Sequence, residues 1–298
     1  MEATTAPPPV TTPTRRALPG AAVAVVVGVL IAVIWSYEFV DDVVGGAISG
    51  LFLGADHVAE PGLVGTLAFA TVAGLAGTFT ACNIACFASV GPLAAGTGAT
   101  TPSRAALVRH AAAQLGWLAL GMSVVAAAYG VVVVAAGDGT VMLSDETMAG
   151  MPVRLVQASV INVVLGVGLV YVAVRYLTGA PLRGRRGILS LGALLGLLVV
   201  GRPFPMFREV LAAAVDAHPL VGVGLLVLVV LGNLALVGIL YLAFVAAAGP
   251  ALQRFVARHQ LTVLRVGGYL LLALGAFSIA YWGLRVPAIF GIGWFPTV

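Results

Sequence analysis

Successive runs of apolar residues, each about 20 residues or longer, fill most of this 298-residue chain. A helix of that length is enough to cross the hydrocarbon core of a bilayer. Hydrophobic residues make up 61% of the chain and charged residues only 9%, which excludes a water-soluble globular fold. We therefore predict an all-α integral membrane protein with about seven transmembrane helices. The predicted spans are residues 17–40, 62–93, 106–136, 153–177, 187–215, 219–248 and 262–283.

The charges between the spans alternate along the chain and predict its orientation. Arginines gather in the connections 94–109, 175–186 and 250–265, whereas the intervening connections are acidic or mixed. Because cytoplasmic loops of membrane proteins are enriched in basic residues, these three connections are expected inside, together with Arg15 and Arg16. We expect a multi-pass protein of the plasma or inner membrane, with its N-terminus in the cytoplasm and its C-terminus outside. The arginines form no single patch, so nucleic acid is not an expected partner.

The two ends of the chain differ from the rest. Residues 1–16 are rich in Pro and Thr and predict a disordered cytoplasmic tail. Residues 17–40 follow two arginines, as the apolar region of a signal peptide does, but the run is longer than such a region. We predict a retained N-terminal transmembrane helix; the alternative is a cleaved signal peptide, with Ala47–Gly50 as the cleavage site. Residues 284–298 mix aromatic residues with Gly and Pro and predict a tail at the outer interface.

Both cysteines of the chain, Cys82 and Cys86, lie in the second predicted span. In a regular helix this spacing puts them on one face, with Cβ atoms about 5–6 Å apart. A disulfide needs about 3.5–4.5 Å between Cβ atoms, so the helix must unwind locally before the pair can oxidise. Polar and helix-breaking residues accompany the pair, namely Thr80, Asn83, Gly91 and Pro92. We predict two catalytic thiols facing a shared cavity; the alternative is two small buried side chains on a packed helix.

The fifth predicted span contains a second break. Its central residues are Gly201, Arg202, Pro203, Phe204 and Pro205. Two prolines remove two backbone donors, so the helix must break, and inside a membrane such a break survives only in protein or beside water. An arginine at this depth costs about 3 kcal/mol on insertion scales unless it is paired. The alternative is a shorter span that ends at Val200 and leaves Arg202 and Arg208 at the outer interface.

The six spans within residues 62–283 form two sets of three, and a broken helix leads each set. Because three is odd, the second set is inverted relative to the first, which is the 3+3 arrangement of inverted-repeat carriers. Such carriers place their site where the two discontinuous helices meet. Asn162 and Asn233, each in the middle of a span, are candidates for hydrogen bonds between helices.

At these residues the chain resembles the CcdA/DsbD transmembrane family of six-span thiol-disulfide carriers. Thr80-Ala81-Cys82 with Gly91-Pro92-Leu93 is similar to the family's first cysteine–proline motif, and the segment from Gly201 to Pro205 is similar to the second. The resemblance covers residues 62–283. It departs from the family at Phe204, where the second cysteine belongs, so both thiols of this chain lie on one helix.

The resemblance implies a membrane thiol-redox carrier that passes reducing equivalents across the membrane in cytochrome c biogenesis. Cys82 and Cys86 would be the redox couple, without a cofactor. An outward-facing thioredoxin-like or apocytochrome-type thiol protein and a cytoplasmic thiol reductant would be its partners. Whether the chain is an enzyme stays open; the redox hypothesis makes it a thiol-disulfide oxidoreductase-like carrier.

Two alternatives stay open. Two thiols also suit a soft metal such as a copper or mercury ion, which His57 or His110 could hand on. A protein that keeps the fold without the chemistry would instead be a non-catalytic membrane assembly subunit.

Overall fold

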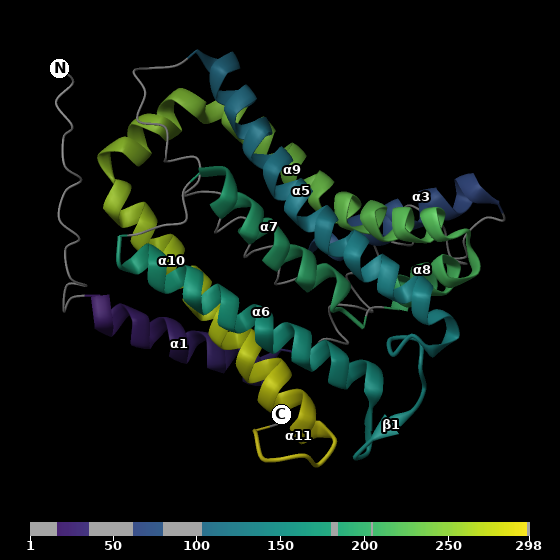
Figure 1. Ribbon diagram of the computed structural model, residues 1–298. Coiled ribbons are helices and arrows are strands. Elements are labelled where there is room, and N and C mark those ends of the chain that lie inside the picture. The colour runs from purple at the N-terminus through teal and green to yellow at the C-terminus, as the bar shows by residue number, and fades with distance from the viewer. Residues whose placement is uncertain (1–16, 36–61, 80–102, 180–183, 204, 297–298) are drawn as a thin grey trace, which may run out of the picture.

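The computed structural model describes residues 17–35, 62–79, 103–179, 184–203 and 205–296 (Figure 1). Apart from one short hairpin, their regular structure is helical. Within these residues, four helices are long and apolar enough to cross a membrane, and a bent pair would make a fifth. The prediction of a helical, multi-pass membrane protein is confirmed. The count of seven spans stays a prediction, because the second predicted span continues beyond the described residues.

The helix bounds follow the apolar runs of the sequence. In chain order, the helices are α1 (Ala17–Ile34), α3 (Leu63–Ala76), α5 (Arg104–Ala136), α6 (Val153–Leu177), α7 (Gly184–Val200), α8 (Pro205–Asp216), α9 (Pro219–Arg258), α10 (Gln260–Ala280) and α11 (Val286–Ile289). A 3₁₀ turn, Gly77–Phe79, follows α3, and a π-helical turn, Tyr281–Arg285, follows α10. The 40-residue α9 is about 60 Å long, so it continues well past a bilayer core of about 30 Å.

A small hairpin lies in the acidic connection between α5 and α6, where no strand was predicted. Strands β1 (Thr147–Met148) and β2 (Met151–Pro152) pair in antiparallel register. The two turn residues have positive φ, 53° at Ala149 and 83° at Gly150, as a tight two-residue hairpin requires.

The predicted fifth span breaks where its prolines predict. Helix α7 ends at Val200, and α8 begins at Pro205 after a bend of 93°. The end of α7 is also the end that the shorter alternative predicts for this span. The second helix of the pair, α8, packs on α9 and α3 (Figure 1).

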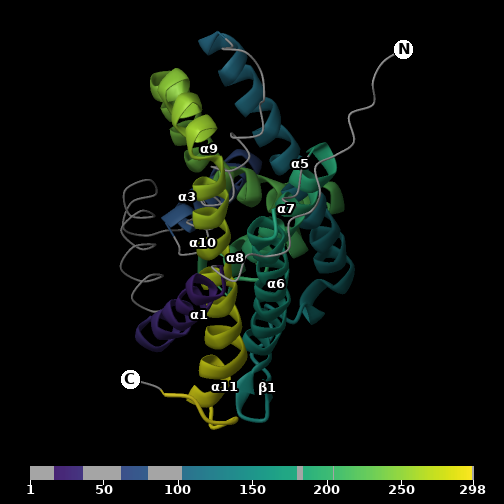
Figure 2. The same ribbon diagram turned by 90° about the vertical axis from the view of Figure 1, so that its left-hand side faces the viewer.

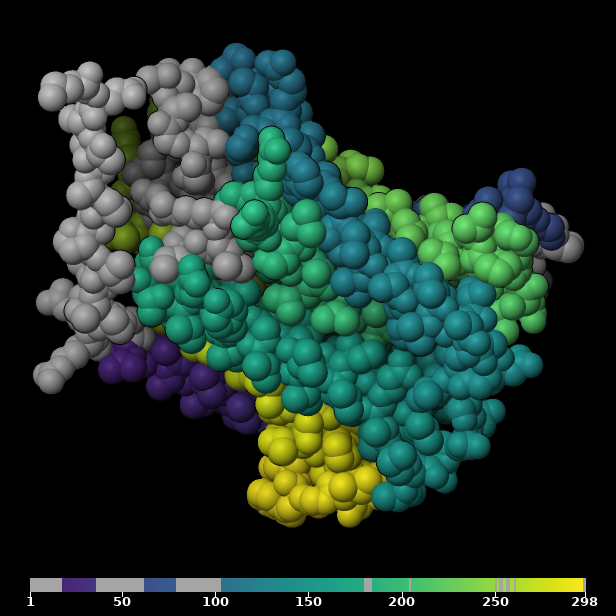
Figure 3. All heavy atoms as spheres, viewed as in Figure 1, coloured from purple at the N-terminus to yellow at the C-terminus, as the bar shows by residue number. Residues whose placement is uncertain are grey.

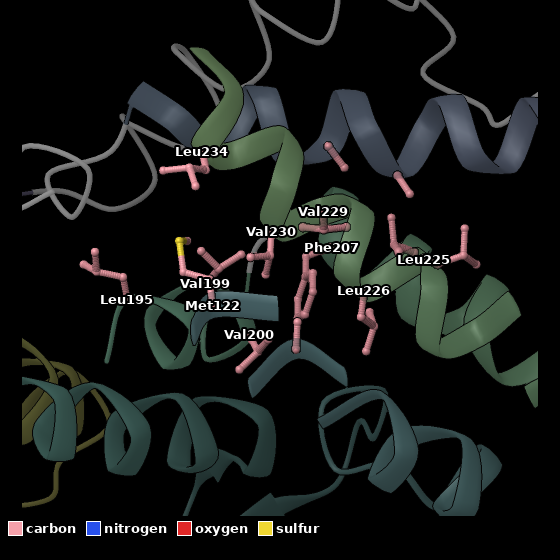
Figure 4. Packing of buried hydrophobic residues seen from close by; sticks show 14 of the residues in the cluster. Met122, Leu195, Val199, Val200, Phe207, Leu225, Leu226, Val229, Val230 and Leu234 are labelled. Atoms are coloured by element: carbon pink, nitrogen blue, oxygen red, sulfur yellow. The ribbon is translucent and has the colours of Figure 1, made fainter. Parts of the chain in front are cut away.

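The helices pack in pairs: α3, α5, α7 and α9 surround one main apolar cluster, and α6 and α10 form most of a second one. Helix α5 packs on both α7 and α9, α3 packs on α9, and α6 packs on α10 (Figures 1 and 2). Side chains of α5, α7, α8 and α9 point into the centre of the main cluster (Figure 4). Its labelled members are Met122, Leu195, Val199, Val200, Phe207, Leu225, Leu226, Val229, Val230 and Leu234.

Glycines let three of these helix pairs touch backbone to backbone. In the α3–α9 pair, a Cβ on Gly74 would overlap the carbonyl oxygen of Val229, and a Cβ on Gly232 would overlap that of Thr71. Each glycine thus faces the carbonyl three residues before the other glycine. Small residues at the interface are the usual means by which membrane helices approach closely.

The α5–α7 pair repeats this pattern with different residues. A Cβ on Gly121 would overlap the carbonyl oxygen of Leu189, and a Cβ on Gly192 would overlap that of Leu118. Again each glycine faces the carbonyl three residues before its partner glycine.

The α6–α10 pair uses a third glycine contact. A Cβ on Gly166 would lie 2.9 Å from the carbonyl oxygen of Gly275, and a Cβ on Gly275 would lie 2.8 Å from that of Gly166. Each glycine also faces the residue four positions after the other, Val170 or Ile279. The contact is therefore symmetric: each helix presents a glycine and the residue four positions later to the glycine of the other helix.

Candidate functional site

The predicted site residues fall into two groups. Cys82 and Cys86 lie outside the described residues, as do the other predicted residues of their segment: Thr80, Asn83, Gly91 and Pro92. Phe204 of the second break also lies outside them. Gly201, Arg202, Pro203 and Pro205 are described. The structure therefore describes the helix that leads into the cysteine segment and most of the second break.

The helix that leads into the cysteine segment ends against polar groups of the other half of the chain. After α3, the turn Gly77–Phe79 tightens the chain. A Cβ on Gly77 would lie 3.2 Å from Nη1 of Arg202 and 3.2 Å from Oδ1 of Asn233. Both polar groups therefore lie in tight contact with the position that a side chain at residue 77 would occupy.

Arg202 reaches the end of α3 from the break between α7 and α8. Its Nη1 donates a hydrogen bond to the carbonyl oxygen of Gly77 at 3.0 Å. The last carbonyl groups of a helix have no partner within the helix, and they carry a partial negative charge. A guanidinium is a suitable partner for them, and the bond reduces the cost of an arginine at a half-buried position.

Arg208, six residues further on, lies in a different environment. Its Nη2 is 3.5 Å from Oδ1 of Asp145, which also accepts from Nη1 of Arg154 at 2.8 Å. The Asp145 side chain is 85% exposed. The Arg208 side chain is 32% exposed and points to a surface carboxylate, whereas Arg202 points to a backbone carbonyl inside the helix bundle.

Two buried residues complete the contact between α3 and α9. Thr78 and Asn233 are 7% and 3% exposed, and Oγ1 of Thr78 donates to the backbone carbonyl of Asn233 at 3.2 Å. Asn233 was a candidate for a hydrogen bond between helices, and its backbone carbonyl accepts one from the segment after α3.

The predicted hydrogen bond at Asn162 is formed in the same way. Ser278 Oγ on α10 donates to the backbone carbonyl of Asn162 at 2.7 Å, while the side chain of Asn162 donates to Ala158 in its own helix at 2.9 Å. The amide side chain therefore does not carry the interhelical bond that the sequence suggested for it.

A small pocket lies where these elements meet, with room for about one water molecule. It is lined by Ala73, Gly74, Gly77, Val199, Arg202, Phe207, Val229 and Asn233. Its walls come from α3, from both sides of the α7–α8 break, and from α9. Two of its lining side chains, Arg202 and Asn233, are polar, so the pocket can orient a polar group within an apolar surrounding.

Sequence reasoning identified some of these residues and missed others. Arg202 was identified because it lies beside the two prolines of the predicted break. Asn233 was identified because it is a polar residue in the middle of a predicted span. Gly77 and Phe207 gave no signal, because a glycine and an apolar residue are common in any membrane helix. His110, a candidate for metal transfer, lies at an exposed position near the start of α5, and its Nε2 is 2.8 Å from Nε2 of Gln114.

No protein-family model, curated protein or solved structure matches the chain. The break between α7 and α8 and its polar contacts with the end of α3 are thus the observations that bear on function.

Proposed function

We propose that this chain is a membrane thiol-redox carrier of the CcdA/DsbD type. In this proposal, Cys82 and Cys86 pass reducing equivalents across the membrane to an outward-facing thiol protein in cytochrome c biogenesis. The observation that carries the proposal is the hydrogen bond from Arg202 to Gly77. It joins the second break to the helix that leads into the cysteines.

Chain length supports a site near this contact. Cys82 follows Phe79 by three residues, and three residues span at most about 11 Å. The cysteine segment therefore starts close to Gly77 and Thr78, which contact Arg202 and Asn233. Polar groups that meet within apolar helices are a usual mark of a functional site in a membrane protein.

The glycine contacts support the proposed 3+3 inverted repeat. If residues 62–283 contain two repeats, α3, α5 and α6 correspond to α7, α9 and α10. The α3–α9 contact then corresponds to the α7–α5 contact, and both have the same glycine pattern. The α6–α10 contact corresponds to itself: Gly166 faces Gly275 and Ile279, and Gly275 faces Gly166 and Val170. The two broken helices occupy equivalent places in this scheme.

The proposed step is a thiol–disulfide exchange that balances within the two proteins. The thiolate of Cys82 attacks one sulfur of the partner's disulfide, forms a mixed disulfide and releases the other sulfur as a thiolate. The thiolate of Cys86 then attacks the sulfur of Cys82 and releases the partner's second thiolate. A Cys82–Cys86 disulfide forms, two electrons pass to the partner, and the two thiol protons end on the partner's thiols.

The carrier must then be reduced again. A cytoplasmic dithiol protein of the thioredoxin class supplies two electrons by the reverse exchange and becomes a disulfide itself. Since the fifth span has no cysteine, the pair on the second span must be reached from both sides of the membrane. The other half contributes no thiol. It contributes Arg202, which holds the end of α3 next to the cysteine segment.

Thiol trapping in cells tests this proposal. Under it, Cys82 and Cys86 are partly oxidised, and Cys82→Ser and Cys86→Ser each leave the outward-facing thiol partner oxidised. The double Cys82→Ser/Cys86→Ser variant is the matched baseline for both single variants. A pair that is always reduced, or a double variant with unchanged function, would contradict redox transfer.

Those contrary results separate the two alternatives. Binding of cuprous or mercuric ion that is lost in both single variants would indicate soft-metal transport. Full function of the double variant would indicate a non-catalytic assembly subunit.

A further inference from the structure

The first helix of the chain packs along one face of α10. A Cβ on Gly28 would overlap the carbonyl oxygen of Ala273 and would lie 3.0 Å from Cβ of Ala276. Near the start of α1, Gly20 similarly leaves room for the ring of Tyr269. Figure 2 shows α1 beside α10, and in Figure 3 α1 (purple) lies against the C-terminal part of the chain (yellow). The contact has the close glycine packing found at the other helix pairs.

Arg285 joins the other end of α1 to the segment after α10. It is 6% exposed and lies at the end of the π-helical turn. Its Nη1 donates to the carbonyl oxygen of Ala32 at 2.8 Å and to that of Trp35. The guanidinium also lies over the ring of Tyr281, 5.6 Å from the ring centroid.

Aromatic side chains surround this contact. Trp35 meets Phe277 edge to face at 5.7 Å, and Phe277 stacks on Tyr281 at 5.5 Å between ring centroids. The buried Ala32 and Val286 belong to the same apolar cluster. The aromatic contacts make the surroundings of the Arg285 hydrogen bonds apolar, so the bonds are stronger there than in water.

The hydrogen bonds from Arg285 satisfy polar groups on both sides of this contact. The last carbonyl groups of a helix such as α1 have no donor within the helix, and an unpaired polar group is costly in a membrane. A buried arginine is costly in the same place unless it finds acceptors. If α1 were removed, Arg285 would lose the two carbonyl acceptors that it has at the end of α1.

We propose that α1 stays in the mature protein as a fixed helix of the membrane domain and that Arg285 is the residue that anchors it. Residues 17–40 are then not a removable signal peptide, although they follow two arginines. This inference does not depend on thiol chemistry, so it stands or falls separately from the proposed function.

The intact mass of the protein tests the retention of α1 without any variant. The chain, carrying a C-terminal tag, is purified from membranes and weighed. A mass that includes residues 17–35 is the expected result. A chain that begins after Gly50 would overturn the proposal.

A second experiment tests the anchor itself. A site for a specific protease is inserted between α1 and α3, and the folded protein is cut in detergent. The α1 fragment should stay with the rest of the chain in size-exclusion chromatography. Arg285→Leu should release it, and Arg285→Lys, which keeps a charged donor, should release less.

Two variants within α1 complete the design. Gly28→Leu should also release the fragment, because a side chain there overlaps the backbone of α10. Val23→Leu is the matched control, since Val23 is 62% exposed, and it should retain the fragment. Equal retention in Arg285→Leu and the unaltered protein would overturn the role of Arg285.

Discussion

Nη1 of Arg202 lies 3.0 Å from the carbonyl oxygen of Gly77, although the two residues are 125 positions apart in the sequence. The bond connects the end of α3 with the point at which the chain leaves α7. The end of α3 is also held by Thr78, which donates to the carbonyl of Asn233. The segment that carries both cysteines therefore starts from a fixed position.

Arg202→Met removes the donor to Gly77 and should destabilise the fold by about 1.5–3 kcal/mol, the usual range for a hydrogen bond with a charged group. Arg202→Lys should lose less, because it keeps a charged donor with different geometry. Arg208→Met is the matched control: its partner Asp145 is 85% exposed, and an ion pair with such a solvated carboxylate is expected to contribute at most about 1 kcal/mol. Unfolding of the three variants in mixed detergent micelles measures these differences. Equal losses at both arginines would contradict the distinction between a part-buried bond to a backbone carbonyl and an ion pair with an exposed carboxylate.

Gly74→Ala should force α3 and α9 apart, because the new methyl group overlaps the carbonyl oxygen of Val229. Overpacking of this kind costs about 1–3 kcal/mol. Gly116→Ala in α5 is the control, since a Cβ at Gly116 meets nothing within 4 Å, and alanine favours a helix over glycine. Thermal unfolding in detergent compares the two. A Gly74→Ala protein as stable as the unaltered one would show that the two backbones are not in contact.

Ser278→Ala removes the hydrogen bond from α10 to the carbonyl of Asn162 on α6. Hydrogen bonds between membrane helices contribute about 0.6 kcal/mol on average, so a loss of that size is expected. The control is Ser190→Ala, whose hydroxyl donates within its own helix to Gly187 at 2.9 Å. The free energy of unfolding should fall more for Ser278→Ala than for Ser190→Ala, and the reverse order would argue against a bond between α6 and α10.

The proposed orientation can be tested with single cysteines in the Cys82→Ser/Cys86→Ser background. Thr147→Cys lies at an exposed position of the hairpin that is expected outside, so a membrane-impermeant maleimide should label it in intact cells. Ala105→Cys lies at an exposed position near the start of α5, beside a connection expected inside. It should be labelled only after the membrane is permeabilised. The opposite pattern would invert the predicted topology.

Much of the helical fold follows from local properties of the chain. The predicted span 153–177 coincides with α6 because span length and hydropathy depend only on neighbouring residues. The paired prolines predicted the break after Val200 for the same kind of reason, since Pro203 and Pro205 cannot donate backbone hydrogen bonds. The continuation of α9 to Arg258, ten residues past its predicted end, was missed because a helix can go on beyond the bilayer.

Local sequence was thus enough to predict a bundle of membrane helices, a broken fifth span and a polar centre near it. The partners within that bundle depended on tertiary packing. The carbonyl of Gly77 accepts a hydrogen bond from Arg202, 125 positions away in the sequence. The carbonyl of Ala32 accepts one from Arg285, 253 positions away. In a bilayer, apolar helices have little hydrophobic preference for one neighbour over another, so close backbone contacts at glycines and a few hydrogen bonds select the pairs. Such contacts need two surfaces in register, which only the assembled structure provides.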